Sequence, residues 1–271
     1  MPGFALPLLL ALALALPGGA AADRRMLAAE EAPTYSGVGR LNVAGTRFCT
    51  ATLIAPDLAL TAAHCLYHPR SKRRVPLGEF RFVAGLRLGA YAAVRRVRRA
   101  AVAEDYIYSG DATMRTVRRD LALLELDAPV AAADAGVFAI GPPLRDHAPV
   151  ALVSYARDRA HAPSIEDVCG VKAAIGLVAA LDCDVTYGAS GAPVFVEDAA
   201  GARKIAAVVS AMGRGPGRRP VALAVMVEPT LGALRERLEA WPVRRPRGAP
   251  GRAPAPPPRP AHRTALATDP S

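Results

Sequence analysis

The feature that most limits the fold of this chain is a long succession of short strand candidates with one helix candidate near the end. The strand candidates are rich in Val, Ile, Leu and Ala and are separated by Gly, Pro and Asp. They span residues 38–43, 48–54, 58–61, 79–86, 91–102, 120–126, 149–156, 193–197, 204–212 and 221–227, with a further hairpin over 168–184. Strands that do not alternate with helices favour antiparallel β-barrels over an α/β sheet.

The helix candidate covers residues 229–241. Pro229 suits the first turn of a helix. The pattern places an apolar stripe on one face, formed by Leu231, Leu234, Leu238 and Trp241. This helix ends the predicted globular domain, which spans residues 34–241.

Both ends of the chain differ in composition from this domain. Residues 1–22 contain an apolar run, 4–16, followed by small residues, which is typical of a secretory signal peptide. The run is shorter than the roughly 20 residues that cross a bilayer. Residues 23–33 are polar and are predicted to be a propeptide or an unstructured arm. Residues 242–271 are dominated by Arg, Pro, Ala and Gly and are predicted to be a disordered tail. We therefore expect export to the periplasm or the medium, without stable membrane insertion after signal removal.

The chain has four cysteines, Cys49, Cys65, Cys169 and Cys183. An even number in an exported chain favours two disulfides, and no pair has the short Cys-x-x-Cys spacing of common zinc sites. Three pairings are possible. The nearest-neighbour pairing closes two short loops, each worth about 3 kcal/mol in the chain-entropy model. We expect no metal and no cofactor.

Three polar residues stand at positions suited to nucleophilic catalysis. Ser190 lies between Gly188 and Gly191, and glycines allow a sharp turn on which two amide groups can converge on an oxyanion. His64 follows the strand candidate 58–61, next to a cysteine. Asp120 opens a buried strand, where a carboxylate needs a hydrogen-bonding partner such as an imidazole.

The order His64, Asp120, Ser190 is that of the chymotrypsin-type triad. The motifs around these residues, Thr-Ala-Ala-His-Cys, Asp-Leu-Ala-Leu-Leu and Gly-Ala-Ser-Gly-Ala-Pro, resemble those of trypsin-like serine peptidases. The stretch 183–191 is most similar to the bacterial glutamyl-endopeptidase branch. The resemblance covers roughly residues 33–241. It implies two perpendicular six-stranded β-barrels, with the site in the cleft between them and a closing C-terminal helix.

The resemblance also implies a role for each site residue. Ser190 would attack the scissile carbonyl of a protein or peptide substrate, and His64 would move the proton. Asp120 would orient the imidazole. The backbone N–H groups of Gly188 and Ser190 would form the oxyanion hole. Ser210 resembles the serine that borders the substrate strand and supports the aspartate.

Two positions differ from the digestive enzymes or bear on specificity. Those enzymes carry an aspartate just before the nucleophile, which pairs with a newly cut N-terminus. Here the residue is Ala189, so we expect that activation mechanism to be absent. Asp184 has the spacing of the carboxylate that gives trypsin its preference for Arg and Lys, although it can equally make a loop hydrogen bond beside Cys183. The segment 209–213 contains no histidine, which disfavours glutamate specificity.

The net charge of +10 leaves two other classes open. One is a catalytically inactive homologue that acts as a binding module for anionic partners. The other is a basic protein that binds nucleic acid or anionic glycans through arginine clusters such as 95–99. That cluster lacks interleaved aromatic residues, so we expect no nucleic-acid partner. We favour a monomeric serine endopeptidase.

Overall fold

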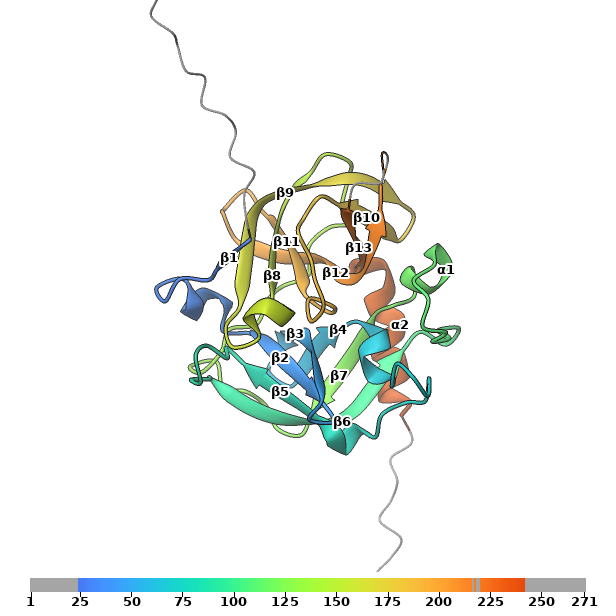
Figure 1. Ribbon diagram of the computed structural model, residues 1–271. Helices are drawn as coiled ribbons and strands as arrows, with labels where there is room; N and C mark the ends of the chain where they lie inside the picture. Colours follow the sequence, from blue (N-terminus) through green and yellow to red (C-terminus); the bar gives the residue numbers. More distant parts are fainter. Residues whose placement is uncertain (1–23, 216, 218–219, 242–271) are drawn as a thin grey trace, which may run out of the picture. The chain divides into compact units, whose positions relative to one another are not determined.

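The structure is a computed structural model that describes residues 24–215, 217 and 220–241. The predicted signal peptide and the predicted tail lie outside the described residues. The described chain folds into two six-stranded antiparallel β-barrels, each built from one half of the sequence (Figure 1). None of its helices is long and apolar enough to cross a membrane.

The first barrel is closed in the order β2-β3-β4-β7-β6-β5. Its strands are β2 (Val38–Val43), β3 (Arg47–Ala55), β4 (Leu58–Thr61), β5 (Phe80–Ala84), β6 (Ala93–Val102) and β7 (Ala122–Leu126). Alternate residues of these strands point inward, and their side chains fill the barrel with a core that includes Leu41, Leu53, Phe80, Phe82 and Leu124.

The second barrel consists of six strands in a ring, because β8 pairs with both β9 and β11. Its strands are β8 (Pro149–Ser154), β9 (Ser164–Ile175), β10 (Val178–Leu181), β11 (Pro193–Glu197), β12 (Arg203–Arg214) and β13 (Pro220–Met226). The predicted hairpin 168–184 corresponds to most of β9 together with β10. A separate core cluster fills this barrel.

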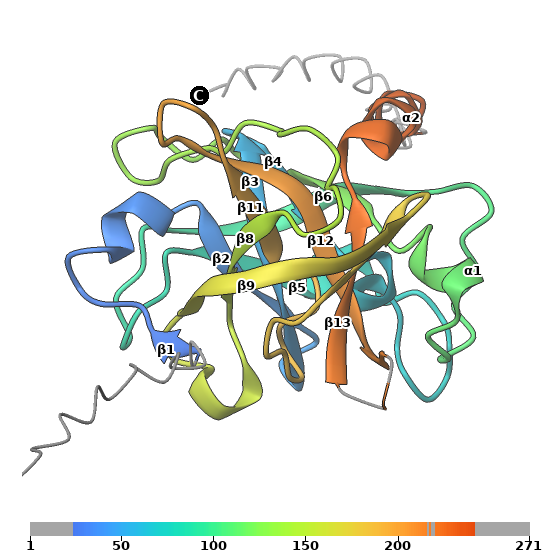
Figure 2. The ribbon, with the colours of Figure 1, turned by 90° about the horizontal axis from the view of Figure 1, so that it is seen from above.

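Short helices join the strands, and one longer helix follows them. The short ones are η1 (Ala32–Tyr35), η2 (Ala63–Leu66), η3 (Leu77–Glu79), α1 (Met114–Val117) and η4 (Arg157–Arg159). The predicted C-terminal helix is α2 (Glu228–Glu239), which buries Leu231, Leu234 and Leu238. It packs on β6 and β7, so the last helix of the second half contacts the first barrel (Figure 1). Figure 2 shows the molecule from above, with α2 labelled.

The N-terminal segment differs from the expected unstructured arm. Residues 25 and 26 form a short strand, β1 (Arg25–Met26), that pairs with β9. Leu27 is fully buried, and the Arg24 guanidinium contacts the carboxylates of Asp158 (3.0 Å) and Asp184 (3.3 Å). These partners lie more than 130 positions away along the chain. The polar composition of the segment therefore says little about its order.

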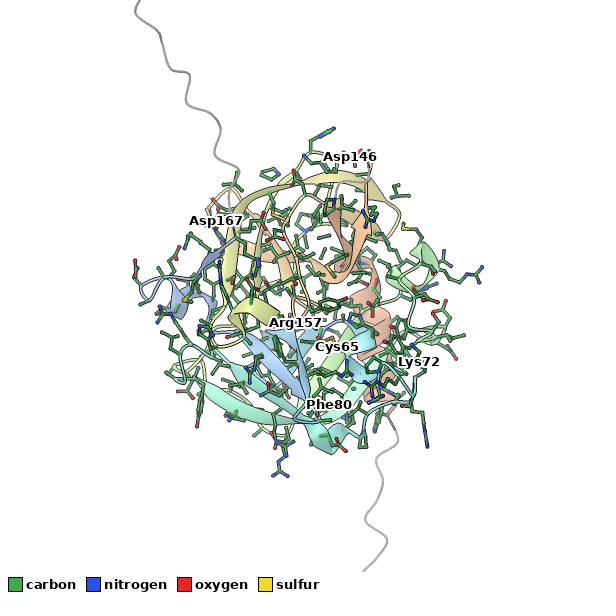
Figure 3. All side chains as sticks on the ribbon, in the orientation of Figure 1. Cys65, Lys72, Phe80, Asp146, Arg157 and Asp167 are labelled. Carbon is green, nitrogen blue, oxygen red and sulfur yellow. A yellow bond between two sulfur atoms is a disulfide. The ribbon has the colours of Figure 1, made fainter. Side chains whose placement is uncertain are left out.

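The two barrels share an apolar boundary. A buried cluster joins Leu60 and Leu123 of the first half to Val153, Tyr155 and Phe195 of the second. The cleft that holds the site residues is lined by side chains from both halves. Figure 3 shows Cys65 and Arg157 near the middle of the molecule, between the two halves.

Candidate active site

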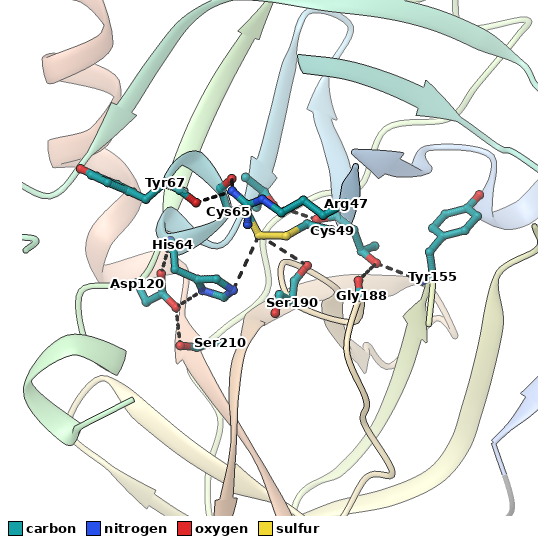
Figure 4. Close-up of a disulfide and its surroundings, with 12 residues drawn as sticks. Arg47, Cys49, His64, Cys65, Tyr67, Asp120, Tyr155, Gly188, Ser190 and Ser210 are labelled. Carbon is teal, nitrogen blue, oxygen red and sulfur yellow. Dashed lines mark hydrogen bonds and ion pairs between the residues drawn. A yellow bond between two sulfur atoms is a disulfide. The ribbon is translucent and has the colours of Figure 1, made fainter. Parts of the chain in front are cut away.

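His64 and Asp120 are brought together by two neighbouring strands of the first barrel. His64 lies in η2 just after β4, Asp120 lies just before β7, and Thr61 pairs with Ala122 in the β4–β7 register. The His64 Nδ1 atom is 2.7 Å from Asp120 Oδ2, and the His64 backbone N–H donates to Oδ1 over 2.7 Å (Figure 4). A proton held on Nδ1 leaves Nε2 as the basic nitrogen of the ring.

The carboxylate of Asp120 also receives a hydrogen bond from the second barrel. Ser210, on β12, donates its hydroxyl to Asp120 Oδ2 over 2.5 Å, and both side chains are buried. Tyr106 faces the same carboxylate. Burial, together with the negative charge of Asp120, raises the pKa of the Tyr106 hydroxyl, so Tyr106 stays neutral beside it. These partners satisfy the buried charge that sequence reasoning required at Asp120.

Ser190 lies on a tight turn between β10 and β11. Gly188 and Gly191, on either side of Ser190, both have positive φ, 94° and 84°. The turn is attached to the first barrel, because the Thr50 N–H donates to the Ser190 carbonyl (2.8 Å) and the Thr50 hydroxyl donates to the Gly188 carbonyl (3.0 Å). A Cβ at Gly191 would lie 2.1 Å from the Thr50 carbonyl oxygen. Close approach of the two barrels therefore requires glycine here.

Along this turn, backbone N–H groups that donate a hydrogen bond within the protein alternate with groups that do not. The Ala189 N–H donates to the Thr186 carbonyl and the Gly191 N–H donates to the Val209 carbonyl. In the part of the chain that the structure describes, the N–H groups of Gly188 and Ser190 donate to no protein acceptor. Two unused donors on the wall of a cleft can bind an oxygen of a ligand.

Ser190 and His64 line the same cleft, which has a volume of about 630 Å³ and also contains Gly188 and Ser210. Among the described residues, the Ser190 hydroxyl makes no hydrogen bond with the imidazole. His64 Nε2 lies instead 3.9 Å from Cys65 Sγ. Contacts between a nucleophile and its base are often loose without substrate and shorten in the complex.

The cysteines form the nearest-neighbour pairs, Cys49–Cys65 and Cys169–Cys183. The first disulfide borders the His64 ring. The second joins β9 to the segment that leads into the Ser190 turn. Two groups of possible metal-ligating side chains within the described residues each contain the two sulfurs of one disulfide. Metal ions bind the thiolate form of cysteine, and the sulfurs of a disulfide are not thiolates, so neither group forms a metal site of this kind.

Asp184 lies outside the lining of the cleft. Its side chain is 66% exposed and contacts Arg24, and its backbone N–H donates to Glu166 Oε2 (2.7 Å). The following residues, Val185, Thr186 and Tyr187, line the cleft instead. This arrangement favours a loop contact over a role at the base of a specificity pocket.

Sequence reasoning missed three residues near the site. Arg47 and Arg157 line the cleft, and Glu166 is buried beside the Cys169–Cys183 disulfide. An isolated arginine or glutamate in a loop or strand carries no local pattern that marks its environment. Their positions depend on which distant segments pack against them.

A family model of the trypsin-like peptidase domain matches residues 49–202. Among solved structures, a Glu endopeptidase in complex with MPD has a TM-score of 0.65 and 18% sequence identity, over 80% of this chain and 96% of that one. A search of curated proteins found no significant match. The structural likeness shows the same fold, two barrels with a C-terminal helix, and the family model covers more than half of the chain. The chain therefore belongs to the trypsin-like peptidase family.

Proposed function

We propose that the protein is an exported endopeptidase in which Ser190, His64 and Asp120 act as the catalytic triad. The observation that carries the proposal is the 2.7 Å contact between His64 Nδ1 and Asp120 Oδ2, in a pair that lines the same cleft as Ser190. The two disulfides and the predicted signal peptide support export.

In this mechanism His64 Nε2 takes the proton of the Ser190 hydroxyl as its oxygen bonds to the scissile carbonyl carbon. The imidazolium then gives that proton to the leaving amine, and the C–N bond breaks to leave an acyl-enzyme. Water attacks the ester by the same route, and Ser190 is regenerated. Asp120 stabilises the imidazolium through its 2.7 Å contact with Nδ1.

The unused N–H groups of Gly188 and Ser190 support an oxyanion hole at this turn. Each such donor contributes about 3 kcal/mol to stabilisation of the transition state in related chemistry. Ala189 is buried and has no carboxylate with which to bind a new N-terminus. We therefore propose that the oxyanion turn forms without an activating ion pair.

A preference for basic residues before the scissile bond would rest on Asp184. The ion pair with Arg24 competes with any substrate cation, so we propose that this preference is weak. A cleavage profile with a peptide library measures it directly. A strong preference for Arg and Lys would show that Asp184 turns toward the cleft when substrate binds.

A fluorophosphonate probe tests the triad. We expect the wild-type protein to be labelled, and Ser190→Ala and His64→Ala to lose labelling. Ser190→Ala should also lower kcat by about six orders of magnitude. Ser71→Ala, in an exposed loop outside the cleft, is the matched control and should behave as wild type. Labelling that survives in Ser190→Ala, or wild-type turnover by that variant, would reject the assignment. An unlabelled and inactive wild-type protein would instead favour a binding module.

A further inference from the structure

The cleft has a leaving-group side that can be identified from the proposed mechanism. The leaving amine receives its proton from His64 Nε2, and Nε2 lies 3.9 Å from Cys65 Sγ. The wall beyond that disulfide is formed by Arg47, Phe48 and Cys49 at the start of β3. Ser210, on the acyl side, lies on the opposite side of the imidazole (Figure 4).

Arg157 is held at the same cleft by the Ser190 turn. Its backbone N–H donates to the Tyr187 carbonyl over 2.7 Å, and its guanidinium stacks over the Tyr187 ring at 4.5 Å. Tyr187 immediately precedes Gly188, whose amide is a proposed oxyanion donor. The cation therefore lies beside the turn that carries the proposed oxyanion donors.

Neither arginine of this region is neutralised by the protein. Within the described residues, no carboxylate lies within ion-pair distance of Arg47 or Arg157. Asp158, next to Arg157 in sequence, contacts Arg24 and Arg159 instead. The Arg47 guanidinium donates to the carbonyls of Cys65 and Tyr67, and burial lowers the pKa of Arg47.

Two acidic residues, Asp111 and Asp120, also line the cleft. Asp120 is buried and contacts His64, and Asp111 precedes α1. Among the described residues, neither acid forms an ion pair with Arg47 or Arg157, so both cations of the cleft keep their charge uncompensated. A guanidinium in a cleft that has no carboxylate partner in the protein is suited to bind a carboxylate of a ligand through charge-assisted hydrogen bonds.

We propose that Arg157 and Arg47 form an anion-binding subsite that favours substrates with Asp or Glu within the first two residues after the scissile bond. This inference rests on the proposed peptidase function. The subsite would bind the residues after the scissile bond, whereas Asp184 was considered for the residue before it.

The test uses two pairs of internally quenched peptides that differ only after the scissile bond, Asp against Asn and Glu against Gln. The wild-type protein should cleave the acidic peptides with a kcat/KM about fivefold higher, as is typical of an exposed charge pair. Arg157→Gln should reduce that ratio to about twofold or less. Arg96→Gln, an equal change of charge at an exposed position outside the cleft, should retain the wild-type ratio.

The acidic preference should also weaken as salt is raised, because exposed charges are screened. Equal rates for acidic and neutral peptides in the wild-type protein would overturn the proposal, as would an unchanged ratio in Arg157→Gln. Fluorophosphonate labelling of Ser190 is read in the same samples. Labelling without acidic preference rejects the subsite alone, whereas loss of labelling in the wild-type protein rejects the peptidase assignment.

Discussion

Glu166 is a buried carboxyl group, and its replacement by glutamine should stabilise the protein in neutral and mildly alkaline solution. The residue lies on β9, is 5% exposed and has its carboxylate close to the Cys169–Cys183 disulfide. It accepts a hydrogen bond from the Asp184 backbone N–H, and Asp184, Asp182 and Arg24 are the charged groups that act on it. Burial is the main cause that raises the pKa of Glu166 to about 7.

The sign of the effect follows from the proton balance. Below about pH 4.5 the side chain is protonated in both the folded and the unfolded chain, and it carries no penalty. As the pH rises, the unfolded chain releases this proton first, so the free energy of unfolding falls until the pH passes the folded pKa of about 7. The separation between the ordinary pKa of 4.5 and about 7 corresponds to roughly 3 kcal/mol.

The amide side chain introduced by Glu166→Gln stays neutral at every pH and keeps an oxygen that accepts the Asp184 N–H. The assay is equilibrium unfolding in urea with intact disulfides, at about pH 5 and about pH 8, in a Ser190→Ala background that prevents self-digestion. Relative to the parent, Glu166→Gln should gain about 2–3 kcal/mol between the lower and the higher pH.

Glu125 provides the control of opposite sign for this experiment. It is also buried, but hydrogen bonds from the Arg99 and Arg98 guanidinium groups lower its pKa. Its contribution to stability is present above the ordinary pKa of 4.5 and is lost as the pH falls through the folded value. Glu125→Gln should therefore destabilise the protein at about pH 8. If Glu166→Gln showed the same stability difference from its parent at both pH values, the reasoning about its buried proton would be refuted.

Two substitutions test the contacts between the barrels. Gly191→Ala should destabilise the protein by at least about 3 kcal/mol, because it combines a positive φ of 84° with a collision against the Thr50 carbonyl. Gly45→Ala is the control, because Gly45 also has a positive φ, 67°, but a Cβ there would meet no other atom within 4 Å. Equal losses of Tm in the two variants would contradict the predicted collision at Gly191. Ser210→Ala removes one hydrogen bond from the Asp120 carboxylate and should lower kcat about tenfold with little change in KM. Steady-state kinetics on one peptide measures this, and an unchanged kcat would remove Ser210 from the positioning of Asp120.

The strands were predictable because they are locally encoded. β2 coincides with its predicted span 38–43, and β12 (Arg203–Arg214) extends the predicted 204–212 by three residues in all. Segments rich in β-branched and apolar residues between turn residues favour strands. The formation of strand β1 was not predictable, because it depends on the burial of Leu27 and on ion pairs with residues far away along the chain.

The same distinction applies to the candidate site. His64, Asp120 and Ser190 stand in short motifs, so their sequence context was sufficient to name them as candidates. The interpretation of Asp184 could not be settled in that way, because Arg24 determines where its carboxylate points. Arg157 belongs to the cleft only because its backbone and guanidinium contact Tyr187, 30 positions later. Local sequence motifs identify candidate catalytic residues. Residues that set substrate specificity are harder to identify, because their positions depend on how distant loops pack.

Several hydrogen bonds that position the candidate triad also connect the two barrels. Asp120 comes from the first barrel and receives the Ser210 hydroxyl from the second, while Thr50 of the first barrel binds the carbonyls of Ser190 and Gly188. A small separation of the barrels would break these contacts together, because hydrogen bonds weaken steeply with distance and misalignment. The Ser190 turn also packs closely against the first barrel, because a Cβ at Gly191 would lie 2.1 Å from the Thr50 carbonyl oxygen. The geometry of the cleft therefore depends on how the two barrels pack against each other.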